Sequence, residues 1–297
     1  MIVSASRRTD ISAWYADWLV RRLREGFVRV KAPYGGKERQ VSLAPADVAG
    51  LVFWSRNPAP AMGALFPLVA AGGRPFYLTA TVTGYPSPLE PDVPSPERVI
   101  PTLRRFAVEY GPASLVWRYD PILLTDAMTP AWHRENFARL AGALAGAADE
   151  VVVSFVDLYR KVAKNLPPAL AGLGVTATKP SRDERRELAH TLAASAREAG
   201  MRLTLCCEPE LVGADLPRSA CVDGARLARV AGGAFPRLPR RPTREGCGCH
   251  ASMDIGAYDT CPAGCPYCYA TQSRERAAAF RRGFDEKAEG LFLSPPR

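Results

Sequence analysis

The feature that most constrains the fold of this chain is a regular alternation of short apolar runs with longer amphipathic segments. The short runs are rich in branched and aromatic residues and are typical of buried strands, whereas apolar side chains at intervals of three or four residues indicate helices. Strands that alternate with helices usually form parallel sheets. The expected strands are 1–5, 51–54, 76–82, 114–117, 150–155 and 202–206, and the expected helices are 10–25, 62–71, 96–110, 130–147, 181–200 and 219–231.

These roughly six β–α units predict an α/β fold, a complete or partial (β/α) TIM-like barrel. Residues 27–31 and 40–43 are expected to form a hairpin around Tyr34-Gly35-Gly36. Residues 1–231 would form the barrel-like catalytic domain. After Ala231 the sequence becomes rich in Pro and Arg and then in Cys. Residues 232–297 are therefore expected to be a C-terminal iron–sulfur cluster-binding segment that closes the barrel mouth and depends on metal or docking for its order.

Polar side chains follow every expected strand, and in (β/α) barrels the active site lies at the C-terminal strand ends. Arginines there could clamp a carboxylate or phosphate, while Asp120 and Asp157 could act as acid–base groups. The alternatives are ion pairs among these residues, and capping or turn formation by the aspartates, because Asp120-Pro121 is also a turn signal. The predicted catalytic residues are Arg7, Arg8, Asp10, Arg118, Asp120, Asp157 and Glu208, and the predicted cofactor-binding residues are Arg56, Asn57 and Tyr267.

The chain has eight cysteines, and five of them fall between Cys247 and Cys268. The N-terminal sequence MIVSASRRTD carries charges where an export signal needs an apolar core, and no apolar run is long enough to span a bilayer. We therefore expect a cytoplasmic protein without a membrane association. Disulfides are rare in that compartment, so clustered cysteines favour metal or redox chemistry.

Three cysteines form a CxxxCxxC motif, Cys261-Pro-Ala-Gly-Cys265-Pro-Tyr-Cys268. Three thiolates on one loop can hold three irons of a [4Fe–4S] cluster, which leaves the fourth iron open for the amino and carboxylate groups of S-adenosylmethionine (SAM). The motif resembles that of radical SAM enzymes, which implies that the backbone near Tyr267 faces the adenine. In most of those enzymes the motif lies near the N-terminus. The alternatives are a zinc site completed by Cys249 or His250, and a ferredoxin-type cluster.

Four further cysteines, Cys206, Cys221, Cys247 and Cys249, could bind an auxiliary [4Fe–4S] cluster or a zinc ion, with Cys207 as a substitute for Cys206. The alternative is that Cys206, Cys207 and Cys221 are small buried hydrophobic residues.

Several stretches resemble an uncharacterised prokaryotic family of domains of unknown function. The resemblance implies a cytoplasmic protein with a C-terminal iron–sulfur motif. The loop ending CPYCYA is also similar to that of spore-photoproduct-lyase-like proteins. The matching stretches are SASRRTDI (4–11), VFWSRNPAP (52–60), TATVTGY (79–85), WRYDPILLT (117–125), SFVDLYRK (154–161) and DIGAYDTCPAGCPYCYA (254–270).

Together these features favour a radical SAM enzyme that acts on a small or anionic substrate with a reducing partner such as flavodoxin or ferredoxin. The net charge of +9 and the basic stretch from Arg237 to Arg244 are also compatible with nucleic acid. That stretch lacks interleaved aromatic residues for base stacking. The alternative functions are a zinc-stabilised protein that binds nucleic acid or phosphate, and an electron-transfer module.

Overall fold

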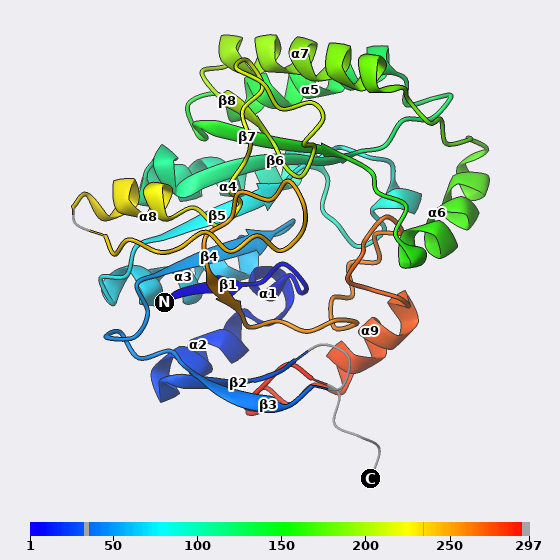
Figure 1. The fold of residues 1–297 in the computed structure, drawn as a ribbon. Helices are drawn as coiled ribbons and strands as arrows, with labels where there is room; N and C mark the ends of the chain where they lie inside the picture. The colour runs from blue at the N-terminus through cyan, green and yellow to red at the C-terminus, as the bar shows by residue number, and fades with distance from the viewer. Residues whose placement is uncertain (33–35, 234, 293–297) are drawn as a thin grey trace.

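The computed structural model describes residues 1–32, 36–233 and 235–292. Seven strands form one sheet in the order β8-β7-β6-β5-β4-β1-β9, and every pair in it is parallel. Figure 1 shows this sheet with helices packed along it. The strands are β1 (Ile2–Ala5), β4 (Gly50–Ser55), β5 (Phe76–Thr81), β6 (Leu115–Ile122), β7 (Glu150–Phe155), β8 (Arg202–Leu205) and β9 (Ser252–Asp254), and a separate antiparallel hairpin pairs β2 (Phe27–Lys31) with β3 (Glu38–Ser42).

Several helices begin or end where the sequence supplies a capping group. Thr129 accepts a hydrogen bond from Trp132 N at 3.3 Å to cap α5, and Ser181 and Glu184 form a capping box at α7. Gly26 ends α2 with a φ of 80°, a left-handed conformation that favours glycine. The helices are α1 (Ile11–Trp14), α2 (Ala16–Glu25), α3 (Leu65–Ala71), α4 (Pro96–Tyr110), α5 (Pro130–Leu144), α6 (Arg160–Leu173), α7 (Arg182–Glu198), α8 (Gly224–Ala231) and α9 (Arg274–Arg282).

The two faces of the sheet are covered by different parts of the chain, because successive strand residues point to opposite sides. Phe53 and Trp117 lie on the face that packs against helices α1 to α5 and α7. On the other face, Val52 and Val116 pack against Leu227 of α8 and against Cys221, Cys247 and Cys249. The cysteine-rich segment is therefore part of the core on the second face.

The predicted α/β fold with a parallel sheet is confirmed, but the sheet is not closed into a barrel. In the described residues β8 and β9 are its two edges. After β8 the chain crosses the second face of the sheet and adds β9 beside β1, so the tail occupies the edge that a closing strand would need. The sequence did not reveal β9 because its three residues are only partly buried and lack a strand-like pattern.

Most expected elements lie within a few residues of their predicted positions. The expected helix 10–25 is divided at Tyr15, and α6 was not predicted because Pro167 and Pro168 lie within it. The predicted hairpin is present, although Tyr34 and Gly35 of its turn lie outside the described residues. Across the described parts of the chain, no helix has both the length and the hydropathy to cross a bilayer.

Candidate functional site

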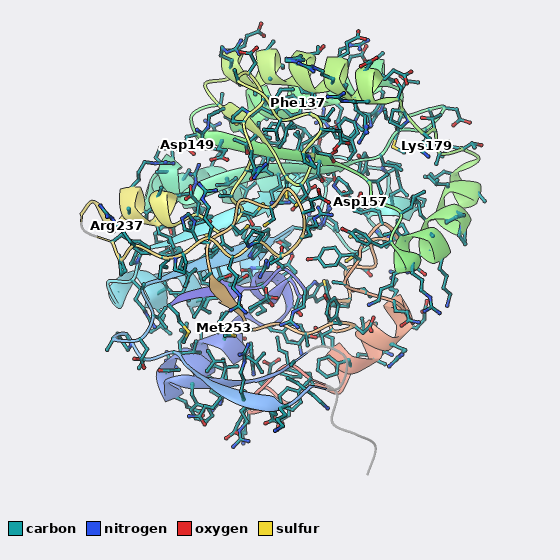
Figure 2. The ribbon with its side chains drawn as sticks, viewed as in Figure 1. Phe137, Asp149, Asp157, Lys179, Arg237 and Met253 are labelled. Carbon is teal, nitrogen blue, oxygen red and sulfur yellow. The ribbon has the colours of Figure 1, made fainter. Side chains whose placement is uncertain are left out.

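A cavity of about 710 Å³ opens at the C-terminal ends of the parallel strands. Asp157, after β7, and Met253, in β9, both line it (Figure 2). All eight cysteines of the chain also line this cavity. The residues that line it from within the last part of a strand, or from just after one, are Ser6, Arg7, Arg8, Thr9, Asp10, Ser55, Arg56, Thr81, Arg118, Asp120, Ser154, Asp157, Cys206 and Cys207.

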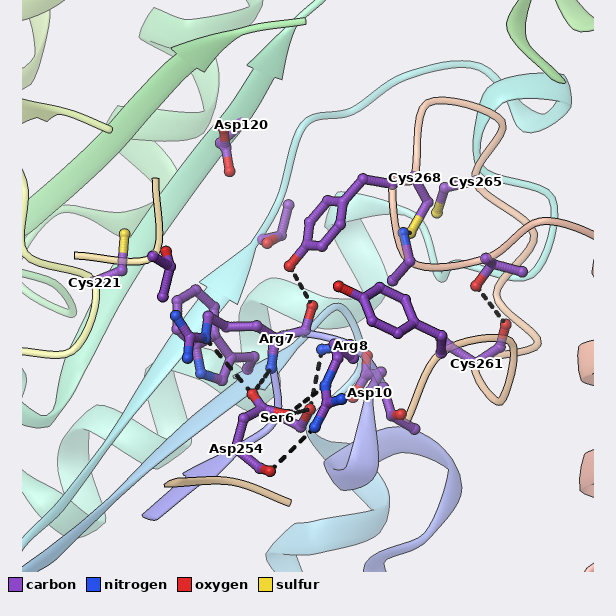
Figure 3. Close-up of a pocket in the computed structure, with 18 of the residues that line it drawn as sticks. Ser6, Arg7, Arg8, Asp10, Asp120, Cys221, Asp254, Cys261, Cys265 and Cys268 are labelled. Carbon is purple, nitrogen blue, oxygen red and sulfur yellow. Dashed lines mark hydrogen bonds and ion pairs between the residues drawn. The ribbon is translucent and has the colours of Figure 1, made fainter. Parts of the chain in front are cut away.

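Asp254, at the end of β9, fixes the turn that follows β1. Its carboxylate accepts hydrogen bonds from Ser6 Oγ at 2.7 Å, Arg7 N at 2.8 Å and Arg8 Nε at 3.0 Å (Figure 3). Burial alone would raise the pKa of Asp254, but the guanidinium groups of Arg8 and Arg7 hold it below its usual value. A Cβ atom on Gly256 would lie 2.1 Å from Ser6 Oγ, so this close approach requires glycine. The tail is thus bound to the first strand by a buried carboxylate.

The first turn after β1 also holds the cysteine loop. Asp10 accepts hydrogen bonds from Ala13 N at 3.0 Å and from Arg56 N at 2.7 Å, so its carboxyl caps α1 and connects β1 with β4. Burial raises the pKa of Asp10 to about 6, against the effect of these hydrogen bonds. The backbone N–H of Asp10 donates to the sulfur of Cys261. Asp10 therefore positions the loop rather than exposing a free acid to the cavity.

Cys261, Cys265 and Cys268 come from one loop that lies between β9 and α9. Cys268 N donates to Cys265 O at 3.1 Å, and the Cys268 sulfur accepts from Ala270 N at 3.3 Å. Burial raises the pKa of the Cys265 thiol to about 12, although the Arg56 guanidinium acts to lower it. Figure 3 shows Cys265 and Cys268 near one another, with Cys221 on the opposite side of the pocket.

The turn inside this loop depends on Gly264, whose φ is 76°. A Cβ atom there would lie 2.7 Å from Cδ of Arg274, and Arg274 in turn pairs with Asp92 at 2.6 Å. The loop is therefore packed between α9 and the segment that precedes α4.

Arg56 and Tyr267 meet at a buried carboxylate that the sequence did not identify. Arg56 Nη1 lies 2.5 Å from Glu90 Oε1, and the hydroxyl groups of Thr83 and Tyr267 donate to the same oxygen. The Arg56 guanidinium also lies over the Tyr267 ring at 5.4 Å. Glu90 belongs to the loop between β5 and α4, where nothing in the local sequence indicates its partners.

Arg118 and Asp120 lie at the end of β6, where the pairing with β7 shifts register between Tyr119 and Ile122. Arg118 pairs with Asp120, and Ser154 donates to the same carboxylate. Arg118 Nη1 also donates to the sulfur of Cys221 at 2.9 Å. This arginine connects the polar wall of the cavity with its second group of cysteines.

Two predicted residues do not line the cavity. Glu208 is buried, accepts from Phe155 N at 2.8 Å and pairs with Arg185 at 3.2 Å. Burial raises its pKa to about 7. Asn57 accepts from Ala59 N at 3.4 Å within its own turn. Both therefore have structural partners and do not themselves line the shared cavity.

The expected ion pairs are partly as predicted. Arg118 pairs with Asp120, whereas Arg7 and Arg8 pair with Asp254. Asp157 pairs with Arg244, the last residue of the basic stretch. Among the described residues, no group of three or more His, Cys, Asp or Glu side chains is arranged to hold a metal ion.

Comparison with known proteins identifies a family. The model of a family described as a domain of unknown function, DUF1848, matches residues 2–270, so the chain belongs to this family. No curated protein matched the chain. No solved structure matched it either.

Proposed function

We propose that this member of the DUF1848 family is a radical SAM-type iron–sulfur enzyme, in which Cys261, Cys265 and Cys268 hold three irons of a [4Fe–4S] cluster and the fourth iron binds SAM. The observation that supports this best is the placement of three thiols of one loop at a cavity beside the strand ends. Within the described residues, the other five cysteines gather on a different wall. The loop therefore offers three thiolates rather than four.

The chemistry of the loop fits such a cluster. Iron–sulfur clusters are tuned by hydrogen bonds to their sulfurs. Backbone N–H groups of Asp10 and Ala263 donate to the Cys261 sulfur, and Ala270 N donates to that of Cys268. Burial raises the pKa of the Cys261 thiol, and its two backbone donors act against that effect, towards the thiolate form in which cysteine binds metal.

When bound, a cluster of this kind supplies one electron to SAM, whose sulfonium cleavage yields a carbon radical. The protein's own residues bind and orient the ligands of the cavity. The single carboxylate of Asp254 faces two guanidinium groups, so the pair Arg7 and Arg8 retains one positive charge in excess. We infer that this charge binds a carboxylate or phosphate group of the ligands in the cavity.

The size of the cavity suits this assignment. Small-molecule and cofactor sites commonly measure about 300–1,000 Å³, and the cavity here measures about 710 Å³. We further infer that the open sheet serves as a partial barrel, whose strand ends supply the site in the way a closed barrel would. The thiols would stay reduced in the cytoplasm, where a flavodoxin or ferredoxin could supply the electron.

Anaerobic reconstitution with iron and sulfide, followed by electron paramagnetic resonance (EPR), tests the proposal. We expect a reduced [4Fe–4S] signal that changes when SAM is added, and its loss in Cys265→Ala. His250→Ala is the matched control, because His250 lies next to Cys249 but its ring contacts Val222, Asp223 and Gly224 at the start of α8. A cluster signal that does not change with SAM would contradict the proposal and favour an electron carrier. One zinc per chain without iron uptake would favour a zinc-stabilised binding protein.

A further inference from the structure

The cysteines outside the loop converge from three separated parts of the chain. Cys206 and Cys207 directly follow β8, Cys221 precedes α8, and Cys247 and Cys249 lie in the tail before β9. They pack on the second face of the sheet, against side chains such as Val152, and they also line the cavity. None of them forms a disulfide.

The five sulfurs form a closed ring of contacts, which we call the thiol ring. The sulfur of Cys206 lies 3.9 Å from that of Cys207 and 3.5 Å from that of Cys221. Cys221 also contacts Cys249, which contacts Cys247, which contacts Cys207. Cysteines that served only as small hydrophobic residues would have no reason to meet one another in this way.

Hydrogen-bond donors point at the thiol ring from several directions. Arg118 Nη1 donates to Cys221 at 2.9 Å, and Val222 N donates to Cys249 at 3.3 Å. Thr243 Oγ1 lies 3.6 Å from the Cys247 sulfur, and Arg244 donates to Cys207. Hydrogen bonds from guanidinium and amide groups to sulfur are also a feature of iron–sulfur sites, where they tune the cluster.

The backbone is shaped to bring these thiols together. Adjacent strand residues point in opposite directions, but Cys207 has a φ of 60°, a left-handed conformation that is uncommon for a residue other than glycine. This turn directs both Cys206 and Cys207 into the ring. Between Cys247 and Cys249, a Cβ atom on Gly248 would lie 2.5 Å from the carbonyl oxygen of Ser219, so only glycine allows the approach. Strain and close approach at one place point to a site.

We propose that the thiol ring holds a second iron–sulfur cluster, with Cys221, Cys247, Cys249 and one thiol of the Cys206–Cys207 pair as its ligands. A structural zinc site is a closed tetrahedron of four ligands. The ring instead has five thiols and opens onto the cavity. A multi-iron cluster is held by four cysteine thiolates.

The position of this second cluster gives it a role in the same cavity. Figure 3 shows Cys221 across the pocket from Cys265 and Cys268, with Arg7, Arg8 and Asp254 in the space between. A substrate held there would lie between the two metal sites. The ligands of the two sites share no residue, so the second cluster does not depend on the proposed SAM-binding loop.

Metal analysis of two variants tests the inference. One variant replaces Cys261, Cys265 and Cys268 with Ala, and the other combines Cys221→Ala with Cys249→Ala. After anaerobic reconstitution we expect about 8 irons per chain in the wild type and about 4 irons and about 4 sulfides in each variant. The ring variant should keep the SAM-sensitive signal, and the loop variant should show a [4Fe–4S] Mössbauer spectrum that SAM leaves unchanged.

The inference is overturned if the folded loop variant holds no iron, or if it holds one zinc ion instead. Circular dichroism shows whether the loop variant folds. If it does not, the difference in iron content between the wild type and the ring variant tests whether the thiol ring holds a cluster. His250→Ala serves again as the control and should retain all of the iron. If the wild type and the loop variant both hold about 4 irons, the result supports the second cluster and contradicts the proposed SAM-binding cluster.

Discussion

Replacing Asp254 with Asn tests how the tail is fixed to the first strand. The carboxylate accepts hydrogen bonds from two serine hydroxyls, from Arg7 N and from Arg8 Nε, and its side chain is only 11% exposed. Breaking a buried ion pair by removing one partner costs about 3–5 kcal/mol, because the other charge is left uncompensated. We expect Asp254→Asn to lower the free energy of unfolding by roughly that amount.

Thermal and urea unfolding measure this loss. For a chain of this size, about 2 °C of melting temperature per kcal/mol predicts a fall of roughly 6–10 °C. Asp215→Asn is the matched control, because Asp215 is exposed and should change stability by less than about 0.5 kcal/mol. A variant as stable as this control would refute the reasoning.

The pH dependence adds an independent check. The pKa of Asp254 is lowered in the folded state, so its stabilising contribution is complete above the unfolded pKa of about 3.9 and is lost as the pH falls through the lower folded pKa. The difference in stability between the wild type and Asp254→Asn should therefore be constant near neutral pH and decrease in acid. A difference that grew on acidification would contradict the assignment.

Three further predictions concern other parts of the molecule. Because burial raises the pKa of Glu208 to about 7, the wild type loses stability as the pH rises from the unfolded pKa towards 7. Glu208→Gln should lack this dependence, so urea titrations at pH 4 and pH 8 should show a relative change in the free energy of unfolding of roughly 3 kcal/mol between the two proteins. Gly248→Ala should remove about 4 irons and keep the SAM-sensitive signal, whereas Gly213→Ala, with no atom within 4 Å of its added Cβ, should keep all iron. Gly256→Ala should weaken the SAM-sensitive signal, since its Cβ would displace Ser6 from Asp254, and an unchanged EPR spectrum would count against that contact.

Local sequence predicted much of the fold because the β–α alternation is set by hydrophobic periodicity. The helix Pro96–Tyr110 and the strand Glu150–Phe155 match their predicted bounds. β9 could not be predicted in this way, since its three residues become a strand only by pairing with β1. The closure of a barrel was not predictable either, because it depends on which edge the tail occupies.

The candidate site, like the fold, was only partly predictable from local sequence. Polar residues at strand ends were expected to meet, and most of them line one cavity. Asp254 and Glu90 were missed because their roles depend on partners distant in sequence, Arg8 and Arg56. The number of cysteines in the sequence suggested a second metal site, but which thiols contact one another depends on the path of the tail across the sheet.

The central claim is that the loop of Cys261, Cys265 and Cys268 leaves one iron of its cluster open. Electron–nuclear double resonance of the reduced, reconstituted protein with SAM labelled at its amino nitrogen and carboxylate carbon tests this directly. We expect hyperfine coupling of both labels to the cluster, present in His250→Ala and absent in Cys265→Ala. Lack of coupling in a fully reconstituted wild type, with the cluster reduced and SAM in excess, would contradict the claim.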